Sequence, residues 1–296
     1  MQPTADPAAP AMELVWDARC AIAESCTWDA ARRWVWFCDI ETGVLHAFDT
    51  ANRAQHRFRL PAPVGSLGLC ESGRLVVALR ASVVLFDPAT GALEVLAELP
   101  DVPAGVRLND GKVGPDGCFW VGTADEREPR QATGALYRIQ PDGGVRKAQV
   151  GAQTSNGLAW SPDGRTLFHS DSRGPWIDRW DFDVATGAIA NRLRIATPDA
   201  AEGRPDGAAC DADGNYWSAG VSAGCLNCFS PGGQLLCKLA TPVPAPTMPC
   251  FADGQLYLTS LRKGLEAHTL ARHPASGGLW RAPFPLAGAP VALFKA

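Results

Sequence analysis

The sequence lacks the features that mark several common classes of protein. No run approaches the roughly 20 consecutive apolar residues that cross a bilayer, and residues 1–12 contain neither the basic segment nor the apolar core of a signal peptide. The formal net charge is -4, so no basic excess exists to attract nucleic acid or an anionic membrane. We therefore expect a cytoplasmic protein that binds neither nucleic acid nor membrane.

Several kinds of chemistry are also missing. No serine occupies a G-x-S-x-G elbow, which argues against an acyl-enzyme mechanism. The 5 histidines form no metal-spaced pair, and we expect His169, on an apolar strand, to be a buried core residue. The 10 cysteines include one close pair, Cys225 and Cys228, without two further ligands at zinc-site spacing. We expect buried, reduced thiols within strands.

The sequence is instead rich in turn residues and repeats itself. It contains 30 Gly, 24 Pro and 10 Trp and shows no long amphipathic helix pattern, which indicates many short strands. A turn followed by two apolar strands recurs at intervals of about 40 to 50 residues, the range of four-stranded propeller blades. The units begin at Ala31, Ser72, Pro115, Pro162, Ala212 and Ala252. The predicted fold is all-β, a six-bladed β-propeller with four-stranded antiparallel blades.

Domain boundaries follow from this repeat. We expect residues 1–12 to be a disordered N-terminal lead-in and residues 13–296 to form a single propeller domain, because one blade cannot bury both of its faces alone. An early strand around Glu13 to Trp16 is predicted to pair with the last blade near Val291 to Phe294. Such pairing would close the ring and remove the exposed edges that an open sheet leaves.

Four polar residues precede the first strands of different blades. They are Glu24, Asn109, Asn156 and Asp206, each followed by an apolar strand and an Asp-Gly-type hairpin at a similar distance. Because these strands face the central channel, we expect the four side chains to converge at one mouth of it. Two carboxylates and two amides form an all-oxygen ligand set that suits Ca²⁺, Mg²⁺ or Mn²⁺. Each residue taken alone is equally typical of an ordinary turn.

Three segments in register carry a resemblance to a known family. RLNDGKVGPDGCFWVGT (Arg107 to Thr123), SNGLAWSPDGRTLFHSDS and GRPDGAACDADGNYW resemble the gluconolactonase, senescence-marker-protein (regucalcin) and LRE-like family of six-bladed propellers. The resemblance extends from about Glu13 to the C-terminus. It implies one divalent metal ion (Ca, Mg, Mn, Zn or Fe) held by Glu24, Asn156 and Asp206.

The resemblance also implies a substrate site. Arg107 and Asn109 match residues that contact the substrate, and Asp110 beside them points either into the site or into a turn. The loop of residues 124–133 matches a lid-like segment, in which Glu126 is expected to reach the substrate. The family usually has Glu-Gly-Pro where this chain has Glu24 followed by Ser-Cys, so the local backbone is expected to differ.

The implied function is hydrolysis of a sugar lactone, an aldono-1,4- or 1,5-lactone, to the aldonic acid. The metal would polarise the carbonyl and activate water, Asp206 would take the proton, and Arg107 with Asn109 would bind sugar hydroxyls or the developing oxyanion. Two alternatives stay open: a broader metal-dependent esterase or phosphotriesterase, and a calcium-binding propeller without turnover. The sequence names neither the sugar, the physiological metal nor the oligomeric state.

Overall fold

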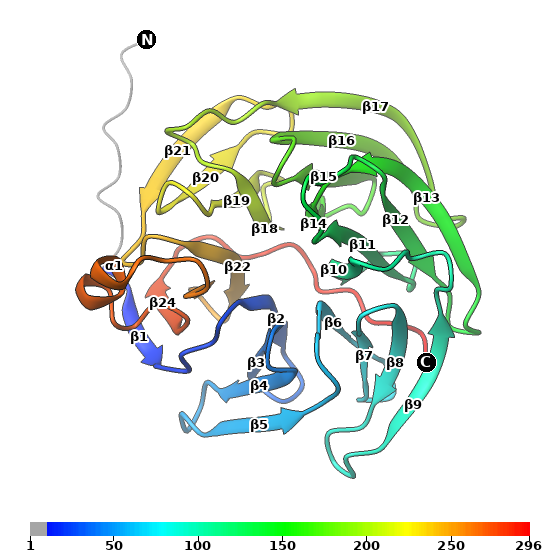
Figure 1. Cartoon of the computed structure of the whole chain (residues 1–296), viewed down its shortest axis with the longest axis horizontal. Coiled ribbons are helices and arrows are strands. Elements are labelled where there is room, and N and C mark those ends of the chain that lie inside the picture. Colours follow the sequence, from blue (N-terminus) through cyan, green and yellow to red (C-terminus); the bar gives the residue numbers. More distant parts are fainter. Residues whose placement is uncertain (1–10) are drawn as a thin grey trace.

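Six four-stranded antiparallel sheets surround a central axis, which confirms the predicted six-bladed propeller (Figure 1). The computed structural model describes residues 11–296. The innermost strands of neighbouring blades contact one another around the ring. They are buried along almost their whole length, whereas the outermost strands are largely exposed, which explains why the repeat reads as an apolar strand followed by mixed ones.

The strands of blades 1 to 3 run from the axis outwards in chain order. They are β2 (Ala23–Asp29), β3 (Trp34–Asp39), β4 (Val44–Asp49) and β5 (Gln55–Arg59); β6 (Ser66–Leu69), β7 (Leu75–Ala78), β8 (Ser82–Phe86) and β9 (Leu93–Glu98); and β10 (Val106–Val113), β11 (Phe119–Asp125), β12 (Gly134–Ile139) and β13 (Val145–Ala152).

Blades 4 and 5 repeat this order, and blade 6 departs from it. The strands are β14 (Ser155–Trp160), β15 (Thr166–Asp171), β16 (Trp176–Asp183) and β17 (Ala188–Ala196); β18 (Pro205–Cys210), β19 (Tyr216–Gly220), β20 (Cys225–Phe229) and β21 (Leu235–Ala240); and β22 (Pro246–Ala252), β23 (Gln255–Ser260), β24 (Leu279–Pro283) and β1 (Glu13–Trp16). A short helix, α1 (Ala267–Arg272), lies between β23 and β24. Within residues 11–296, no helix has the length and apolar character to cross a membrane.

The N-terminal strand closes the ring, but with a different partner from the one predicted. β1 does add to the last blade, and it pairs with β24, with Leu14 opposite Trp280, and not with residues 291–294. Residues 291–294 follow Pro290, which cannot donate to a ladder, and the backbone of Phe294 is engaged by blade 2 instead. Of the predicted lead-in, residues 1–10 lie outside the described part of the chain, and Met12 packs against the apolar cluster between blades 5 and 6.

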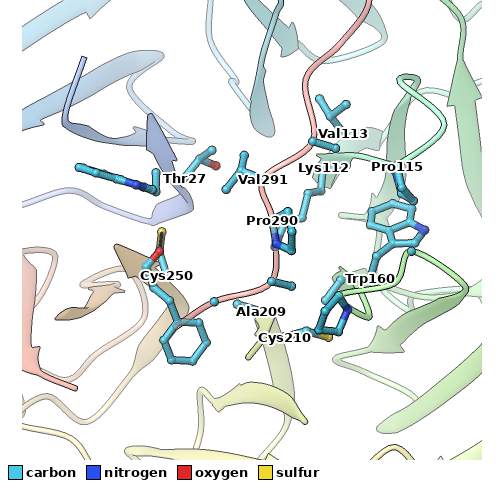
Figure 2. Close-up of a pocket in the computed structure, with 18 of the residues that line it drawn as sticks. Thr27, Lys112, Val113, Pro115, Trp160, Ala209, Cys210, Cys250, Pro290 and Val291 are labelled. Carbon is cyan, nitrogen blue, oxygen red and sulfur yellow. Dashed lines mark hydrogen bonds between the residues drawn. The ribbon is translucent and has the colours of Figure 1, made fainter. Parts of the chain in front are cut away.

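The C-terminal segment, residues 284–296, instead crosses one end of the channel, as the red trace shows (Figure 1). Its backbone hydrogen-bonds to blade 5 through residues 210–212, to blade 2 through residues 69–72 and to Gly117 of blade 3. Phe294 is fully buried in a core cluster. Pro290 and Val291 pass over an apolar cavity of about 240 Å³ that this segment helps to line (Figure 2).

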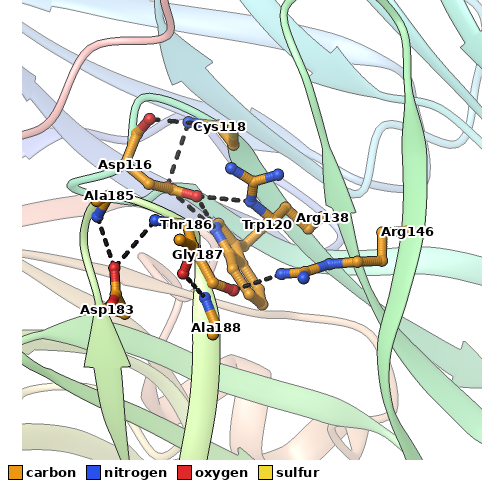
Figure 3. A network of polar contacts seen from close by, with 10 residues as sticks. All are labelled: Asp116, Cys118, Trp120, Arg138, Arg146, Asp183, Ala185, Thr186, Gly187 and Ala188. Carbon is orange, nitrogen blue, oxygen red and sulfur yellow. Dashed lines mark hydrogen bonds and ion pairs between the residues drawn. The ribbon is translucent and has the colours of Figure 1, made fainter.

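Aspartates in the hairpin turns tie strands and blades together at this same end. Asp116, in the turn before β11, accepts a hydrogen bond from the Trp120 indole at 3.2 Å and forms a buried ion pair with Arg138 at 2.7 Å (Figure 3). The neighbouring Arg146 donates to the Gly187 carbonyl of blade 4. The same indole-to-carboxylate hydrogen bond recurs between Trp36 and Asp29 and between Trp217 and Asp211.

Most cysteines are strand residues, as predicted, but Cys20, Cys70 and Cys118 lie outside the strands. Nine of the ten are buried thiols that form no disulfide. Cys225 and Cys228 lie three residues apart on β20, so their side chains leave opposite faces of the strand and do not form a ligand pair.

Candidate active site

The polar residues of the innermost strands occupy equivalent places in their blades. Asn109, Asn156 and Asp206 each lie eight residues before the glycine of the following turn: Gly117, Gly164 and Gly214. In blades 1, 3, 4, 5 and 6 the pairing of the innermost strand slips by one residue at this place. Such a bulge bends the strand and re-aims its side chains, and here it directs polar groups into the channel.

A cavity of about 150 Å³ gathers these side chains at the end of the channel opposite the C-terminal segment. Glu24, Asn109, Asp110, Asn156 and Asp206 all line it, together with Arg107. It opens into a wider mouth of about 1100 Å³, which Glu126 lines. The structure therefore brings together every residue singled out from the sequence, with Glu126 at the rim.

Hydrogen bonds fix the orientation of the Asn156 amide. Its Nδ2 donates to Asp206 Oδ1 at 2.6 Å and to Ser172 Oγ at 2.8 Å. Ser172 in turn donates to the Pro205 carbonyl at 2.6 Å. Because the amide nitrogen is committed to these two acceptors, the Asn156 Oδ1 atom must face another direction, and it is buried with no donor among residues 11–296.

Two carboxylate oxygens in the same cavity are also buried without a hydrogen-bond donor among residues 11–296. Glu24 Oε2 accepts the Ser25 backbone N–H at 2.8 Å, while Glu24 Oε1 is buried without a donor in the described chain. Asp110 Oδ2 accepts the Leu158 backbone N–H at 2.8 Å, while its Oδ1 has no donor there either. Buried acceptors are almost always satisfied in folded proteins, so this cluster of oxygens is suited to a cation.

The acids of the cavity also repel one another. Burial, followed by the charges of Asp206 and Asp110, raises the pKa of Glu24 well above its usual value. Burial and the Asp110 charge raise the pKa of Asp206 to about 8, and burial raises the pKa of Asp110. A cation bound among these three carboxyl groups would lower their pKa values and stabilise their charged forms.

Asn109 differs from the other three residues of the predicted ligand set. Its Oδ1 accepts a hydrogen bond from Arg107 Nη1 at 2.6 Å, and its Nδ2 donates to the Ser155 carbonyl at 2.9 Å. Arg107 Nε also donates to Glu126 Oε1 at 2.9 Å. The amide oxygen of Asn109 is therefore engaged, and Arg107, Asn109 and Glu126 form a connected wall beside the cluster of oxygens.

The departure from the family sequence at Ser25 has a structural counterpart. Ser25 adopts a positive φ of 60°, and its hydroxyl accepts the Leu67 N–H at 2.8 Å and donates to the Leu67 carbonyl at 3.3 Å. These bonds attach the bulge of blade 1 to the innermost strand of blade 2. Glu24 is thus held in the cavity by a loop of different sequence.

Sequence reasoning missed two aspartates that position the site. Asp39 accepts hydrogen bonds from the backbone N–H groups of residues 21 and 22, and Asp171 accepts those of residues 153 and 154. Each carboxylate fixes the chain just before the site residue of its own blade. An aspartate that ends the second strand of the blade, as in WVWFCD and TLFHSD, was the signal that could have found them.

No histidine joins the candidate site. His169 is buried, and its Nε2 lies 2.7 Å from Ser155 Oγ, as expected of a core residue. Among residues 11–296, no three His, Cys, Asp or Glu side chains gather as a metal-binding group. A cation in this cavity would therefore depend on the Asn156 amide as well as on the carboxylates.

Comparisons with known proteins agree with this architecture. Residues 22–262 match the model of the SMP-30/gluconolactonase/LRE-like region. A protein of Pseudomonas putida named 6-deoxy-6-sulfogluconolactonase is 36% identical over 86% of this chain and 89% of its own length. Human regucalcin is 31% identical over 91% and 93% of the two chains. The crystal structure of a calcium-binding protein, regucalcin, from Agrobacterium tumefaciens superposes with a TM-score of 0.91 at 25% identity, covering 97% of this chain and 98% of that one.

Proposed function

This chain belongs to the SMP-30/gluconolactonase/LRE-like family, and from that premise we propose that it hydrolyses a sugar lactone to the aldonic acid. The observation that carries the proposal is the convergence, in one cavity with Asp206, of buried oxygens that have no donor in the described part of the chain. A 36% identical relative named for its action on a sulfonated sugar lactone supports the choice of substrate class.

The donor set of the cavity fits a divalent cation. Glu24 Oε1 and Asn156 Oδ1 are buried acceptors without donors in the described chain, and Asp206 is hydrogen-bonded to Asn156. These three residues would hold the ion, and their oxygen chemistry favours a hard cation such as Ca²⁺, Mg²⁺ or Mn²⁺ over Zn²⁺ or Fe²⁺. Bound there, such an ion supplies Lewis acidity that polarises an ester carbonyl and lowers the pKa of water.

Asp206 is the proposed general base. Its Oδ1 accepts from Asn156, which leaves the second carboxylate oxygen to take a proton from water as the water oxygen attacks the lactone carbonyl carbon. The ester C–O bond then breaks, and the same proton passes to the ring oxygen that leaves. In the metal-free protein, burial and the Asp110 charge raise the pKa of Asp206 to about 8, and a bound cation would lower it and stabilise the carboxylate form that a general base needs.

Arg107 and Asn109 would orient the sugar. Arg107 is buried at the edge of the cavity and is held by Glu126 and Asn109, so its guanidinium is fixed before a substrate arrives. A preorganised guanidinium stabilises an oxyanion without reorganisation during the reaction. Glu126 would then act on the substrate mainly through Arg107.

Calcium binding without turnover is the second candidate. The all-oxygen donor set favours it, and so does the description of the Agrobacterium protein as calcium-binding. The wide mouth above the cavity favours the enzyme, since a purely structural ion needs no access for a substrate of this size.

The test is proton release on a panel of sugar lactones, with a simple aryl ester and a phosphotriester added. Chelated protein, protein reloaded with each divalent metal and the Asp206→Ala variant would be compared. Metal-restored lactone turnover that Asp206→Ala abolishes supports the proposal. Faster turnover of the ester or phosphotriester would favour the broader hydrolase, and calcium binding without turnover of any substrate would favour the binding protein.

A further inference from the structure

Two arginines at the mouth of the candidate active site have side chains without a partner among residues 11–296. Arg173 and Arg204 line both the inner cavity and the wider mouth. Within residues 11–296, neither guanidinium makes a hydrogen bond or an ion pair, and the Nε of Arg204 is buried without an acceptor. A buried donor without an acceptor costs free energy, so this arrangement is suited to a ligand that supplies one.

The other basic side chains of the mouth are neutralised locally. Arg80 and Arg107 pair with Glu126, Arg130 pairs with Glu128, and Lys263 pairs with Glu41. Six basic residues line the mouth, against three acidic ones. This excess of positive charge occurs in a chain whose net charge is -4, so the cationic mouth is a local feature of the site and not of the whole surface.

Both free guanidiniums lie close to the reacting groups. Arg204 precedes Asp206 by two residues, about 7 Å of extended chain, and its charge lowers the pKa of that carboxyl against the effect of burial. Arg173 follows Ser172, the residue that orients Asn156. Partial burial and the nearby charge of Arg204 lower the pKa of Arg173, which indicates that the two cations are close enough to repel each other.

We propose that the lactone acted on by this chain carries an anionic group, a sulfonate, phosphate or carboxylate, at the end remote from the lactone carbonyl, and that Arg204 and Arg173 bind that group. This inference rests on the proposed lactonase function. A planar guanidinium presents two parallel N–H donors to the oxygens of such an anion. Arg204, Arg173 and Asp206 line the same inner cavity, so an anion held by the two arginines would lie in the same site as the proposed base.

The experiment compares matched lactones. Glucono-1,5-lactone, its 6-phospho derivative, 6-deoxy-6-sulfogluconolactone and glucaro-1,4-lactone, which carries a free carboxylate, are assayed with the metal-loaded wild type, Arg204→Gln, Arg173→Gln and Arg165→Gln. Arg165 is an exposed arginine in the turn before β15, outside the residues that line the mouth, and controls for loss of one charge. We expect the ratio of kcat/KM for an anionic lactone to that for the neutral one to fall roughly 10- to 100-fold in Arg204→Gln, less in Arg173→Gln, and not in Arg165→Gln.

The results separate this inference from the proposed function. The rank order of the three anionic lactones identifies the anion. Equal kcat/KM for neutral and anionic lactones, or an unchanged ratio in Arg204→Gln, would overturn the anion site while leaving the lactonase intact. If no lactone is hydrolysed, the lactonase proposal fails, and calorimetry with 6-phosphogluconate decides the anion site. Binding that weakens in Arg204→Gln supports the site, and absence of binding overturns it.

Discussion

The two ends of the channel are built from the same innermost strands and differ in almost every other respect. At one end the strands begin with bulges that collect Glu24, Asp110 and Asp206. At the other, they finish in turns over an apolar cavity, in which Figure 2 shows Lys112; Lys112 and Asp163 are the charged residues of its lining. The C-terminal segment covers that second end. The repeated blades give both ends of the channel the same backbone framework. The side chains at the two ends of the innermost strands differ, and they give the two ends different roles.

The difference is also energetic. Buried carboxylates that repel one another reduce stability, whereas fully buried apolar residues at the covered end contribute to it. Lys112 lines the apolar cavity, its Nζ donates to the Ala208 carbonyl at 2.8 Å, and its charge lowers the pKa of both Glu24 and Asp110. We therefore expect mutations at the first end to affect activity and mutations at the second to affect folding.

The largest effect is expected for Asp206→Asn. It should reduce kcat for lactone hydrolysis roughly 10²- to 10⁴-fold, because a proton acceptor is lost. The unfolding free energy of the metal-free protein should stay the same or rise, because a repulsive charge is removed and the Asn156 hydrogen bond can be kept. Steady-state kinetics and urea unfolding measure the two quantities. Asp213→Asn, an exposed residue of the same blade, is the control, and a large loss of stability in Asp206→Asn would contradict the comparison.

The covered end should show the opposite behaviour in Phe294→Ala. Phe294 is fully buried, so its truncation should cost about 3 to 5 kcal/mol of unfolding free energy, with little change in kcat/KM of the folded fraction. Val291→Ala is the matched control, because that side chain is 43% exposed in the same segment. Equal effects of the two substitutions on the urea midpoint would show that the segment does not anchor the blades.

The unfolding free energy should fall at acid pH because of a core histidine and at alkaline pH because of a carboxyl group of the site. Burial lowers the pKa of His169 to about 4, so its contribution is complete above its ordinary pKa of about 6.5 and is lost as the pH falls towards 4, by roughly 3 kcal/mol. In metal-free protein the pKa of Asp206 is raised, so its contribution is lost as the pH rises towards 8. Urea unfolding from pH 4.5 to 9 tests both.

Matched variants identify which groups cause the losses of unfolding free energy at acid and at alkaline pH. His169→Gln should reduce the pH dependence of the unfolding free energy at acid pH, and His268→Gln, at an exposed position, should not. Asp206→Asn should flatten the alkaline side. If the loss of unfolding free energy at acid pH persists in His169→Gln, other groups cause it. His46 is the first candidate, because burial lowers its pKa to about 4 as well.

The smallest effect is expected for Ser172→Ala, at the polar end. Loss of the Ser172 hydroxyl leaves the Asn156 amide held by Asp206 alone, and weakening of the hydrogen bonds that orient a ligand costs roughly 10- to 100-fold in metal affinity. Calcium titration by calorimetry would measure it, with the exposed Ser72→Ala as control. Unchanged affinity would remove Asn156 from the proposed ligand set.

Much of the fold was predictable because its signals are local. The apolar innermost strands, the Asp-Gly turns and their interval are properties of short segments, and they gave the correct number and type of blades. The partner of β1 was predicted wrongly, since pairing residues 13–16 with β24 or with residues 291–294 is a choice between segments far along the chain. Asp39 and Asp171 could have been found from the sequence, because each ends the second strand of its blade.

The amino-acid sequence by itself determined the repeat, and through the repeat it placed Asn109, Asn156 and Asp206 at equivalent positions. Only the tertiary structure decided what each does, because hydrogen bonds from other blades distinguish them. Asn109 has its oxygen engaged by Arg107, whereas Asn156 has its nitrogen engaged and its oxygen left without a donor in the described chain. Likewise, the absence of partners for the Arg173 and Arg204 side chains within residues 11–296 depends on which acids the folded blades bring within reach. Spacing along a chain fixes position, whereas the partners of a side chain are fixed by contacts between segments that are distant in sequence.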